Sequence, residues 1–298
     1  MDREQEPPLR AFFGDSLQQR SDALLNRQPE ALAFQERVFN AAFESIERAT
    51  IPLCQRDENA DVCHRSGILI DIAGTRFLVT AAHEIIANRN SGRHLQIVLP
   101  EKGKPTVPLI DELFWTTIDD EEDLLITRLE KSTLKAMGDY HTFVRVRDML
   151  SRQHVRGRKA LFLILGFPYA MVRPDTDGDP CVETWKYISY PFDGDLTSVT
   201  NYNPNIHHVL IYEQKTWNKE GELVHPPGLS GSGVWLLDIT SVHEPITPET
   251  FKLVAIQNAW RDCYEYAKAT WIDIALIAIW KHFPEMRRPL MVNGFKWP

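Results

Sequence analysis

Short apolar stretches separated by turn residues recur along most of the chain. The clearest example is residues 66–72, where apolar side chains alternate with others, followed by the turn signal Ala73-Gly74 and a returning apolar segment at residues 75–82. This arrangement predicts a β-hairpin. Further segments of strand length and composition are residues 95–99, 107–110, 124–129, 160–165, 184–189, 209–212, 233–238, 251–259 and 268–274. Short strands at such spacing predict an all-β fold.

One N-terminal stretch has a helical pattern instead. From Pro29, which suits a first helical turn, apolar residues share one predicted helix face: Leu32, Phe39, Ala42, Phe43 and Ile46. The helix should end before Ile51-Pro52, because the residue before proline avoids helical geometry. We expect this helix to pack on the back of the domain. A docking arm for a regulator or for a second copy is the alternative.

Composition and charge narrow the class of protein. The chain has 298 residues, 43% of them hydrophobic, which is enough for one or two packed cores. Its net charge of −8 argues against general binding to nucleic acid. The start, Met1–Pro8, lacks the apolar core of a secretion signal, and charges interrupt every apolar segment before the ~20 residues that cross a bilayer. We therefore expect a cytoplasmic protein with no nucleic-acid or membrane partner and with free cysteines.

Three features that could indicate other functions are weak. Cys54, Cys63 and His64 lack the paired spacing of a zinc site. The acidic residues 175–179 lack the late bidentate glutamate of a calcium loop. The basic run at 145–159 has no interleaved aromatic residues, so we interpret it as a solvated linker. The sequence therefore predicts no metal and no cofactor.

The candidate chemistry centres on Gly228-Leu229-Ser230-Gly231-Ser232. A serine hydroxyl becomes a good nucleophile only beside a base and an anion-stabilising pocket. The flanking glycines allow a sharp turn that exposes Ser230 and directs amide N–H groups to one point. Taken alone, the loop also fits the nucleophile elbow of α/β-hydrolases or a purely structural glycine-rich hairpin.

Two upstream segments distinguish these alternatives. An apolar strand ends in Thr80-Ala81-Ala82-His83, and Asp123 stands directly before another apolar strand, with Asp119 and Asp120 as rival acids. The chain order is therefore His, Asp, Ser. Chymotrypsin-like enzymes have this order, whereas α/β-hydrolases place the serine first and subtilisins place the aspartate first.

With these motifs in this order, the sequence resembles the trypsin-like (chymotrypsin-fold) serine peptidases of the bacterial intracellular type. The motif at Thr80–His83 matches the family's TAAH, Asp123–Ile126 its acid-containing strand start, and Gly228–Ser232 its G-x-S-G-[GS]. Gly166-Phe167-Pro168 resembles the segment that opens the second barrel. The resemblance spans roughly residues 60–280.

The resemblance implies a fold and a domain organisation. It implies two six-stranded Greek-key β-barrels, preceded by an N-terminal helical extension over residues 1–50. The first barrel, 51–150, would carry the histidine and the aspartate, and the second, 151–298, the serine. Residues 271–283 would form the C-terminal helix that packs across the barrels, followed by a tail to Pro298.

The resemblance also implies roles for the motif residues. His83 would be the general base and then the general acid, Asp123 would orient it, and Ser230 would be the nucleophile. The backbone N–H groups of Gly228 and Ser230 would form the oxyanion hole. The implied function is a serine endopeptidase that cleaves protein or peptide substrates through an acyl-enzyme. An esterase of the same fold and a catalytically silent binding or sensing module remain alternatives.

Substrate-binding residues can be suggested only by alignment with the family. Val224, six residues before the nucleophile, would form the floor of the main side-chain pocket, and an apolar floor disfavours cleavage after Arg or Lys. A residue among Gln257, Asn258, Ala259 and Trp260 would line the pocket wall and pair with the substrate backbone as an added strand.

The residue before the nucleophile departs from the family pattern. Many members have an aspartate there, which pairs with a new amino terminus after zymogen cleavage, but this chain has Leu229. No Ile-Val-Gly-Gly-like activation site precedes the first barrel either. We therefore expect no zymogen activation, and regulation by a protein partner instead.

Overall fold

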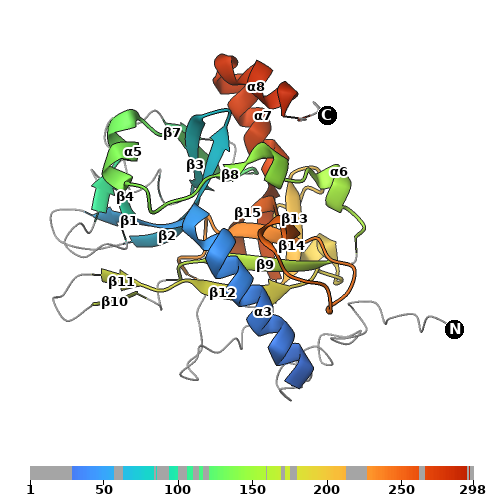
Figure 1. The fold of residues 1–298 in the computed structure, drawn as a ribbon. Coiled ribbons are helices and arrows are strands. Elements are labelled where there is room, and N and C mark those ends of the chain that lie inside the picture. The colour runs from blue at the N-terminus through green and yellow to red at the C-terminus, as the bar shows by residue number, and fades with distance from the viewer. Residues whose placement is uncertain are drawn as a thin grey trace, which may run out of the picture.

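The computed structural model describes residues 29–56, 63–83, 85, 94–99, 106–109, 114–116, 121–158, 160–168, 172–174, 180–212, 227–261, 266–293 and 295. Two curled, mainly antiparallel β-sheets lie against each other, with helices at their margins (Figure 1). The predicted all-β fold of two barrel-like sheets with an N-terminal and a C-terminal helix is confirmed.

The first sheet is built around the predicted hairpin. Its strand order is β5-β4-β1-β2-β3-β7-β6, and β8 pairs with β2 in parallel. The strands are β1 (Thr50–Arg56), β2 (Cys63–Ile72), β3 (Thr75–Ala81), β4 (His94–Val98), β5 (Thr106–Pro108), β6 (Phe114–Thr116), β7 (Leu124–Arg128) and β8 (Val144–Arg145). The helix α5 (Lys131–Met137) follows β7.

The second sheet has six strands in the order β12-β9-β14-β15-β16-β13. They are β9 (Leu161–Gly166), β12 (Trp185–Ser189), β13 (His207–Ile211), β14 (Gly233–Leu237), β15 (Phe251–Arg261) and β16 (Tyr266–Trp271). The residues that follow β12 close the second sheet into a barrel by pairing with β13. Ile211 N donates to Tyr190 O (2.9 Å), and Phe192 N donates to Val209 O (2.9 Å). A separate hairpin joins β10 (Val172–Pro174) and β11 (Pro180–Val182).

Side chains of both sheets share one hydrophobic cluster. The central strands β9 and β14 are buried along their whole length, which matches their unbroken apolar sequence. Their side chains pack with those of β2, β3 and β7 of the first sheet in the largest cluster of the molecule. A second cluster fills the first barrel alone. Continuous packing of this kind holds the two barrels together as one unit.

The N-terminal helix α3 (Pro29–Ser45) packs against the second barrel, but not through the whole predicted face. Its buried residues are Ala31, Phe34, Val38 and Ala42. By contrast, Leu32 and Phe43, which the sequence pattern places inside, are 41% and 60% exposed. The sequence carries two overlapping apolar stripes, and the one with small residues around Phe34 allows the closer approach to the barrel.

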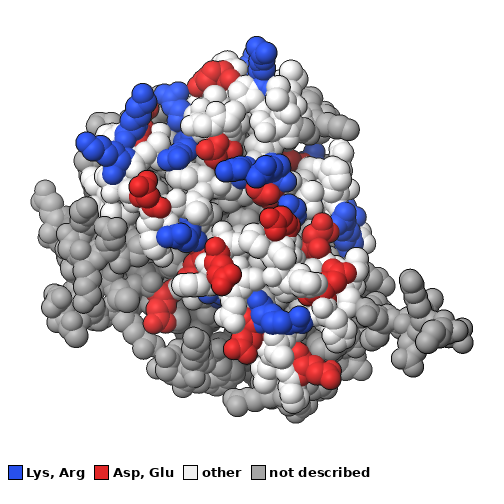
Figure 2. All heavy atoms as spheres, in the orientation of Figure 1, with Lys and Arg blue, Asp and Glu red and all other residues white. Residues whose placement is uncertain are grey.

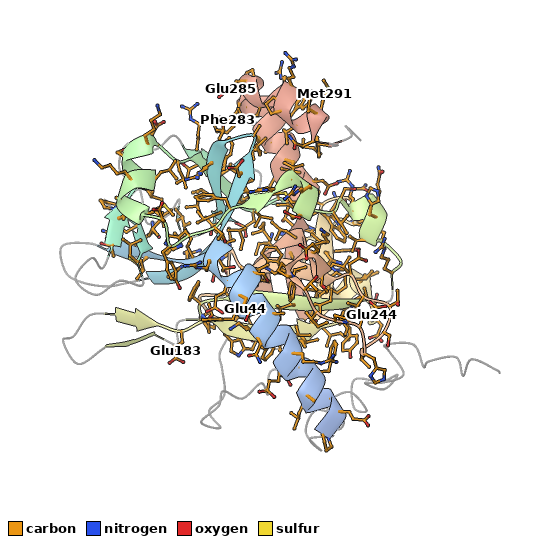
Figure 3. All side chains as sticks on the ribbon, in the orientation of Figure 1. Glu44, Glu183, Glu244, Phe283, Glu285 and Met291 are labelled. Carbon is orange, nitrogen blue, oxygen red and sulfur yellow. The ribbon has the colours of Figure 1, made fainter. Side chains whose placement is uncertain are left out.

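The predicted C-terminal helix is present as α7 (Ile272–His282), and it contacts strands of both barrels. Strand β16 ends at Trp271, so the predicted strand over residues 268–274 is too long. The residues expected as a tail form a short 3₁₀ helix, Pro284–Met286, and a further helix, α8 (Arg287–Val292). Phe283 lies near the junction of α7 with this segment (Figure 3). Its ring packs edge-on against Phe77 of the first barrel, with 5.1 Å between the ring centroids.

The remaining helical segments are short. They comprise α6 (Arg152–Val155) and the 3₁₀ helices Glu47–Ala49, Val146–Asp148, Leu196–Ser198 and Pro248–Thr250. The basic run between the barrels is not simply solvated, because Arg152 is largely buried, with its Nε 3.6 Å from Asp273 Oδ2 of α7. Among the described helices, none is long and apolar enough to cross a membrane.

Candidate active site

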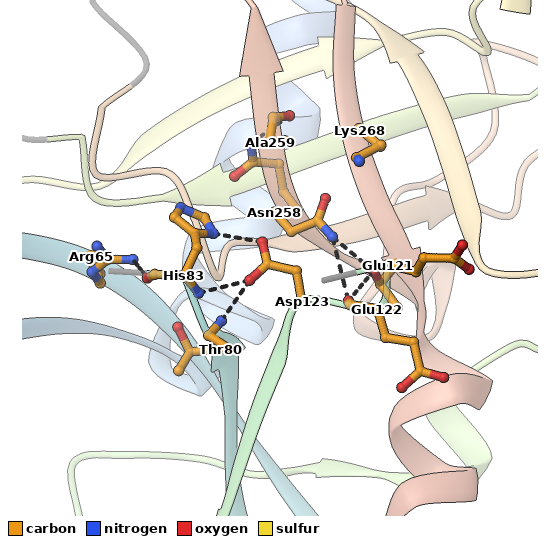
Figure 4. Close-up of polar contacts among 12 residues, drawn as sticks. Arg65, Thr80, His83, Glu121, Glu122, Asp123, Asn258, Ala259 and Lys268 are labelled. Carbon is orange, nitrogen blue, oxygen red and sulfur yellow. Dashed lines mark hydrogen bonds and ion pairs between the residues drawn. The ribbon is translucent and has the colours of Figure 1, made fainter. Parts of the chain in front are cut away.

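The structure brings His83 and Asp123 together. His83 follows the end of β3 and Asp123 directly precedes β7, and these strands pair with Ala81 opposite Leu124. The two side chains therefore meet at the same edge of the first sheet. His83 Nδ1 lies 2.5 Å from Asp123 Oδ2 (Figure 4). A proton on Nδ1 shared with this carboxylate leaves Nε2 as a free acceptor, which is the tautomer that a general base needs.

The Asp123 carboxylate is held in place by the backbone. Its Oδ1 accepts hydrogen bonds from His83 N (2.7 Å) and Ala82 N (3.1 Å). The residue itself has a φ of 47°, in the left-handed region that side chains other than glycine seldom adopt. The carbonyl oxygen of His83 accepts a hydrogen bond from Arg65 Nη1 (2.8 Å). Arg65 is buried, with 2% of its surface exposed. These contacts define the orientation of the acid and of the imidazole.

Side chains of the second barrel hold the segment that leads into Asp123. Thr270 Oγ1 donates to Glu122 O (2.6 Å), and Asn258 Nδ2 donates to Thr270 Oγ1 (2.8 Å) and toward Glu122 O (3.5 Å). His207 Nε2 donates to Glu121 O at 2.5 Å, and burial lowers the pKa of this histidine. Asp123 therefore belongs to the first barrel, but side chains of the second barrel hold the two residues that precede it (Figure 4).

The Ser230 loop has the sharp turn that its glycines predict. Gly228 and Gly231 have φ angles of 97° and 92°, a region that glycine enters without steric cost. Ser232 N donates to Leu229 O (2.8 Å), and Gly231 N donates to Gln257 O (2.7 Å) on β15. The turn is thus anchored to its own barrel on one side.

On the other side, the loop is anchored to the first barrel through Ser66 of β2. Ser66 N donates to Ser230 O (3.0 Å), and Ser66 Oγ donates to Gly228 O (3.0 Å). The same hydroxyl accepts from Phe167 N (2.8 Å), in the segment that follows β9. We call these three hydrogen bonds the Ser66 joint. They connect the two halves of the chain at the nucleophile loop.

Close packing places this loop against the strand that carries the histidine. A Cβ added to Gly231 would overlap Ser66 O and Thr80 Oγ1, so only glycine fits there. Thr80 itself donates to Ser66 O (2.7 Å) and lies three residues before His83. The loop and the end of β3 are therefore neighbours, although they lie in different barrels.

The reactive groups of the loop are not engaged by other described groups. The N–H groups of Gly228 and Ser230 have no acceptor among the described residues. Ser230 is partly exposed, and no hydrogen bond joins its hydroxyl to His83. Catalytic hydrogen bonds are often long in the absence of substrate. No cluster of metal-ligating side chains occurs in the part of the chain that the structure describes.

The candidate substrate-binding residues differ in exposure. Gln257 and Asn258 are buried, at 2% and 1% exposed, whereas Ala259 and Trp260 are partly exposed. Val224, Asp119 and Asp120 lie outside the described residues. Acidic and basic side chains are interspersed over the face in Figure 2.

Several residues of the site were not found from the sequence. Ser66, Arg65, His207 and Thr270 each hold a motif residue or its neighbour through hydrogen bonds described above. None of the four belongs to a recognisable motif. Each forms its hydrogen bond with a segment distant in sequence, and such a pairing leaves no local pattern. Only Thr80, inside the TAAH motif, carried a local signal.

No protein-family model matches this chain, and none of the curated proteins matches it. Solved structures with a similar fold include the HtrA-type protease AlgW with a tripeptide, with 12% identity, a TM-score of 0.48, and alignment over 81% of this chain and 62% of that one. The structure of GrC aligns with 11% identity and a TM-score of 0.49, over 80% and 95% of the two chains. The thermostable serine protease AL20, from an extremophilic microorganism, aligns with 11% identity and a TM-score of 0.45, over 76% and 91%. This chain thus spans less than two thirds of the length of AlgW.

Proposed function

We propose that the chain is a serine endopeptidase in which His83, Asp123 and Ser230 form a catalytic triad. The observation that carries this proposal is the 2.5 Å contact between His83 Nδ1 and Asp123 Oδ2, at the edge where the other barrel delivers the Ser230 loop. A histidine oriented by an aspartate beside a serine on a glycine turn is the arrangement that acyl transfer to serine requires.

The reaction would proceed through two acyl transfers. His83 Nε2 takes the proton of Ser230 as Oγ attacks the carbonyl carbon of the scissile peptide bond. The tetrahedral intermediate collapses when His83 returns that proton to the leaving amine, and an ester to Ser230 remains. A water molecule, deprotonated by His83, then attacks the ester, releases the carboxylic acid and restores the serine.

The oxyanion of each intermediate would be bound by the N–H groups of Gly228 and Ser230. Both donors lack an acceptor among the described residues, and the positive φ of Gly228 is compatible with a turn that directs them to one point. Each such donor contributes about 3–4 kcal/mol to lowering the barrier in known cases.

A substrate chain would bind alongside the end of β15. The pairing of β15 with β14 stops at Ile256, while its pairing with β16 continues to Arg261. Beyond Gln257, one backbone edge of β15 is therefore not paired with any described strand, and we propose that the substrate adds a strand there, beside the partly exposed Ala259 and Trp260. We assign substrate contacts to these two residues and the pocket floor to Val224. Gln257 and Asn258 would position the loop and the acid.

The enzyme would not depend on zymogen cleavage. Leu229, at the position of the activation aspartate, is 1% exposed and packs in the core cluster. Its burial supports a loop that is formed without a new amino terminus. We therefore propose that a protein partner, rather than proteolysis, controls activity.

The experiment that tests the triad is labelling of the full-length chain with a fluorophosphonate probe. Wild type should be labelled at Ser230, and both Ser230→Ala and His83→Ala should lose the label. Ser232→Ala is the matched control, because Ser232 is a buried serine two residues away and should not affect labelling. Equal labelling of all variants, or none in folded wild type, would favour a silent binding module.

Peptide and ester substrates separate the remaining alternatives. An endopeptidase should cleave internal bonds in a fluorogenic peptide library, with Ser230→Ala inactive. Hydrolysis of nitrophenyl esters without any peptide cleavage would identify an esterase instead. Activity that appears only after a proteolytic nick would contradict the proposed mode of activation.

A further inference from the structure

A cavity of about 470 Å³ lies in the second barrel, away from the candidate active site. It is lined by residues 155–158 and 160–161, from the end of α6 to the start of β9, by the loop after β12, by the start of β13 and by Trp271. None of His83, Asp123 and Ser230 lines it. Its volume falls in the range typical of small-molecule sites.

The walls of the cavity are mainly aromatic and apolar. Tyr190, Phe192 and Tyr202 come from the loop after β12, and Trp271 from the end of β16. Leu161 and Val209 add aliphatic surface. Such walls favour a ligand with a flat or bulky apolar body.

Two lining residues carry buried nitrogen atoms that have no hydrogen-bond partner among the described residues. His208 is 9% exposed, its ring stacks on Trp271 with 4.4 Å between centroids, and its Nε2 has no hydrogen bond. Trp271 Nε1 is likewise buried and unpartnered. Burial lowers the pKa of His208 to about 3, so the imidazole is neutral. Leaving such atoms unpaired is costly. Both nitrogen atoms are inaccessible to solvent, so the cavity is bordered by the rings of His208 and Trp271 and not by these atoms.

Cationic side chains also line the cavity. Arg156 donates to the Pro204 carbonyl and to Asn205 Oδ1 (3.3 Å), both of which are neutral acceptors. Arg158, by comparison, is paired with Asp238 at 3.1 Å. One carboxylate, Asp193, lines the cavity as well. Asp273 interacts electrostatically with Arg156 but forms its close ion pair with Arg152. Within the described residues Arg156 makes no close ion pair of its own, and an acidic ligand group would complement it.

We propose that this cavity binds a small organic anion with an aromatic or bulky apolar body, and that its occupancy regulates the candidate active site. The aromatic walls would contact the body of the ligand, and Arg156 would bind its acidic group. His208 and Trp271 would contact the ligand body with their stacked rings. The regulatory part rests on the function proposed above.

The link to the active site runs through two adjacent strands. His207, which lines the cavity, donates to Glu121 O, and Thr270, the neighbour of Trp271 in β16, donates to Glu122 O. These two carbonyls immediately precede Asp123. A ligand that shifts the start of β13 or the end of β16 therefore acts on the residues that position the acid.

Binding can be tested with 1-anilinonaphthalene-8-sulfonate, which combines an aromatic body with a sulfonate, by fluorescence titration of the full chain. Wild type should bind saturably, and N-phenyl-1-naphthylamine, which lacks the sulfonate, at least about tenfold more weakly. Arg156→Gln should weaken sulfonate binding by a similar factor, and Ala160→Phe, which fills the cavity, should abolish it. Arg147→Gln is the matched control, because that arginine is 70% exposed and lies outside the cavity.

The outcomes separate this proposal from the previous one. Equal binding by Arg156→Gln and Arg147→Gln, or binding by Ala160→Phe that matches wild type, would overturn the site, provided that the variants show wild-type circular dichroism. The probe should also change the rate of fluorophosphonate labelling of wild type but not of Ala160→Phe. An unchanged rate with the cavity occupied would overturn the regulatory role. Absence of labelling with intact, variant-sensitive binding would refute the triad and leave the ligand site standing.

Discussion

At the scale of single residues, Asp123 combines a strained backbone with a carboxylate whose two oxygen atoms both make hydrogen bonds. Its φ of 47° is tolerated because one carboxylate oxygen accepts two backbone N–H groups while the other contacts His83. The conformation thus serves to turn the acid toward the imidazole. Asparagine can adopt the same backbone conformation, and its Oδ1 can still accept the hydrogen bonds from the Ala82 and His83 N–H groups.

Asp123→Asn should therefore fold normally and lose activity. In a triad of this kind, replacing the aspartate by asparagine lowers turnover by roughly 10⁴, because the imidazole takes the wrong tautomer. We expect the rate of fluorophosphonate labelling to fall by a factor of about 10³–10⁴, with an unchanged thermal unfolding midpoint. A loss of less than tenfold would show that Asp123 is not the orienting acid.

His208 gives the stability of the molecule a pH dependence. Its pKa is about 3 in the folded chain, because burial disfavours the charged ring, and is 6.5 for an unperturbed histidine. The unfolded chain therefore gains a proton first as pH falls. The stability contributed by the neutral ring is complete above pH 6.5 and is lost as pH falls toward 3, by about 1.4 kcal/mol per pH unit.

Comparison of wild type with His208→Phe isolates this effect. The variant keeps an aromatic ring between Phe162 and Trp271 but cannot titrate. Urea unfolding at pH 7.5, 6.5 and 5.5 should show a smaller loss of stability in the variant, with the difference approaching about 1 kcal/mol between pH 6.5 and 5.5. His207, whose pKa burial also lowers, contributes equally to both proteins. Parallel stability curves would mean that His208 is not buried in its neutral form.

At the scale of secondary-structure elements, α3 shows where periodicity fails. The helix has two overlapping apolar stripes, and the sequence pattern selected the one with Phe43, which is 60% exposed. The buried stripe contains Phe34, at 1% exposed. Which stripe faces inward depends on the surface of the barrel beneath, and that surface is not visible in the helix sequence.

The two phenylalanines form a matched pair for a stability test. Phe34→Ala should reduce the free energy of unfolding by about 3–5 kcal/mol, because it removes a buried ring and leaves a cavity. Phe43→Ala should change it by less than about 0.5 kcal/mol, as expected for an exposed site. Urea denaturation of both variants measures the difference. The reverse ranking would place the predicted face, with Phe43, against the barrel.

The strands could be predicted where apolar runs end in clear turns, as in the hairpin of β2 and β3. Strand β1 was missed, because Pro52, Gln55 and Arg56 interrupt its apolar pattern, yet it lies between β2 and β4 in the sheet. The predicted strand over 268–274 extended too far, because β-branched residues continue into α7. Long-range packing, rather than local preference, decides such boundaries.

At the scale of the whole molecule, the motif residues could be predicted from the sequence. The residues that hold them in place through hydrogen bonds, such as Ser66 and Thr270, could not. His83 and Asp123 stand beside strand ends, so their meeting follows from one strand pair. Ser66 acts on a carbonyl 162 residues away, and Thr270 on one 148 residues away. Partners so distant are set by the docking of the barrels, which leaves no pattern in a single sequence.

The Ser66 joint can be tested by a single substitution. Ser66→Ala leaves the Phe167 N–H and the Gly228 carbonyl without their partner, which should cost about 1–3 kcal/mol of unfolding free energy. Labelling of Ser230 should slow as well, because the loop loses one of its anchors. Ser198→Ala, at an exposed serine of the second barrel, is the control and should match wild type. Unaltered stability and labelling in Ser66→Ala would show that the hydroxyl does not join the barrels.

The sequence distance within the Ser66 joint has a consequence during protein synthesis. Ser230 emerges from the ribosome 164 residues after Ser66, since 230 − 66 = 164, which at roughly 5–20 residues per second is a delay of about 8–33 s. Asp123 emerges 57 residues into that interval, since 123 − 66 = 57, and for the remaining 107 residues the proposed triad lacks its nucleophile. Under the proposed function, a nascent chain can therefore cleave peptides only after translation has passed the glycine turn at Gly228–Ser232.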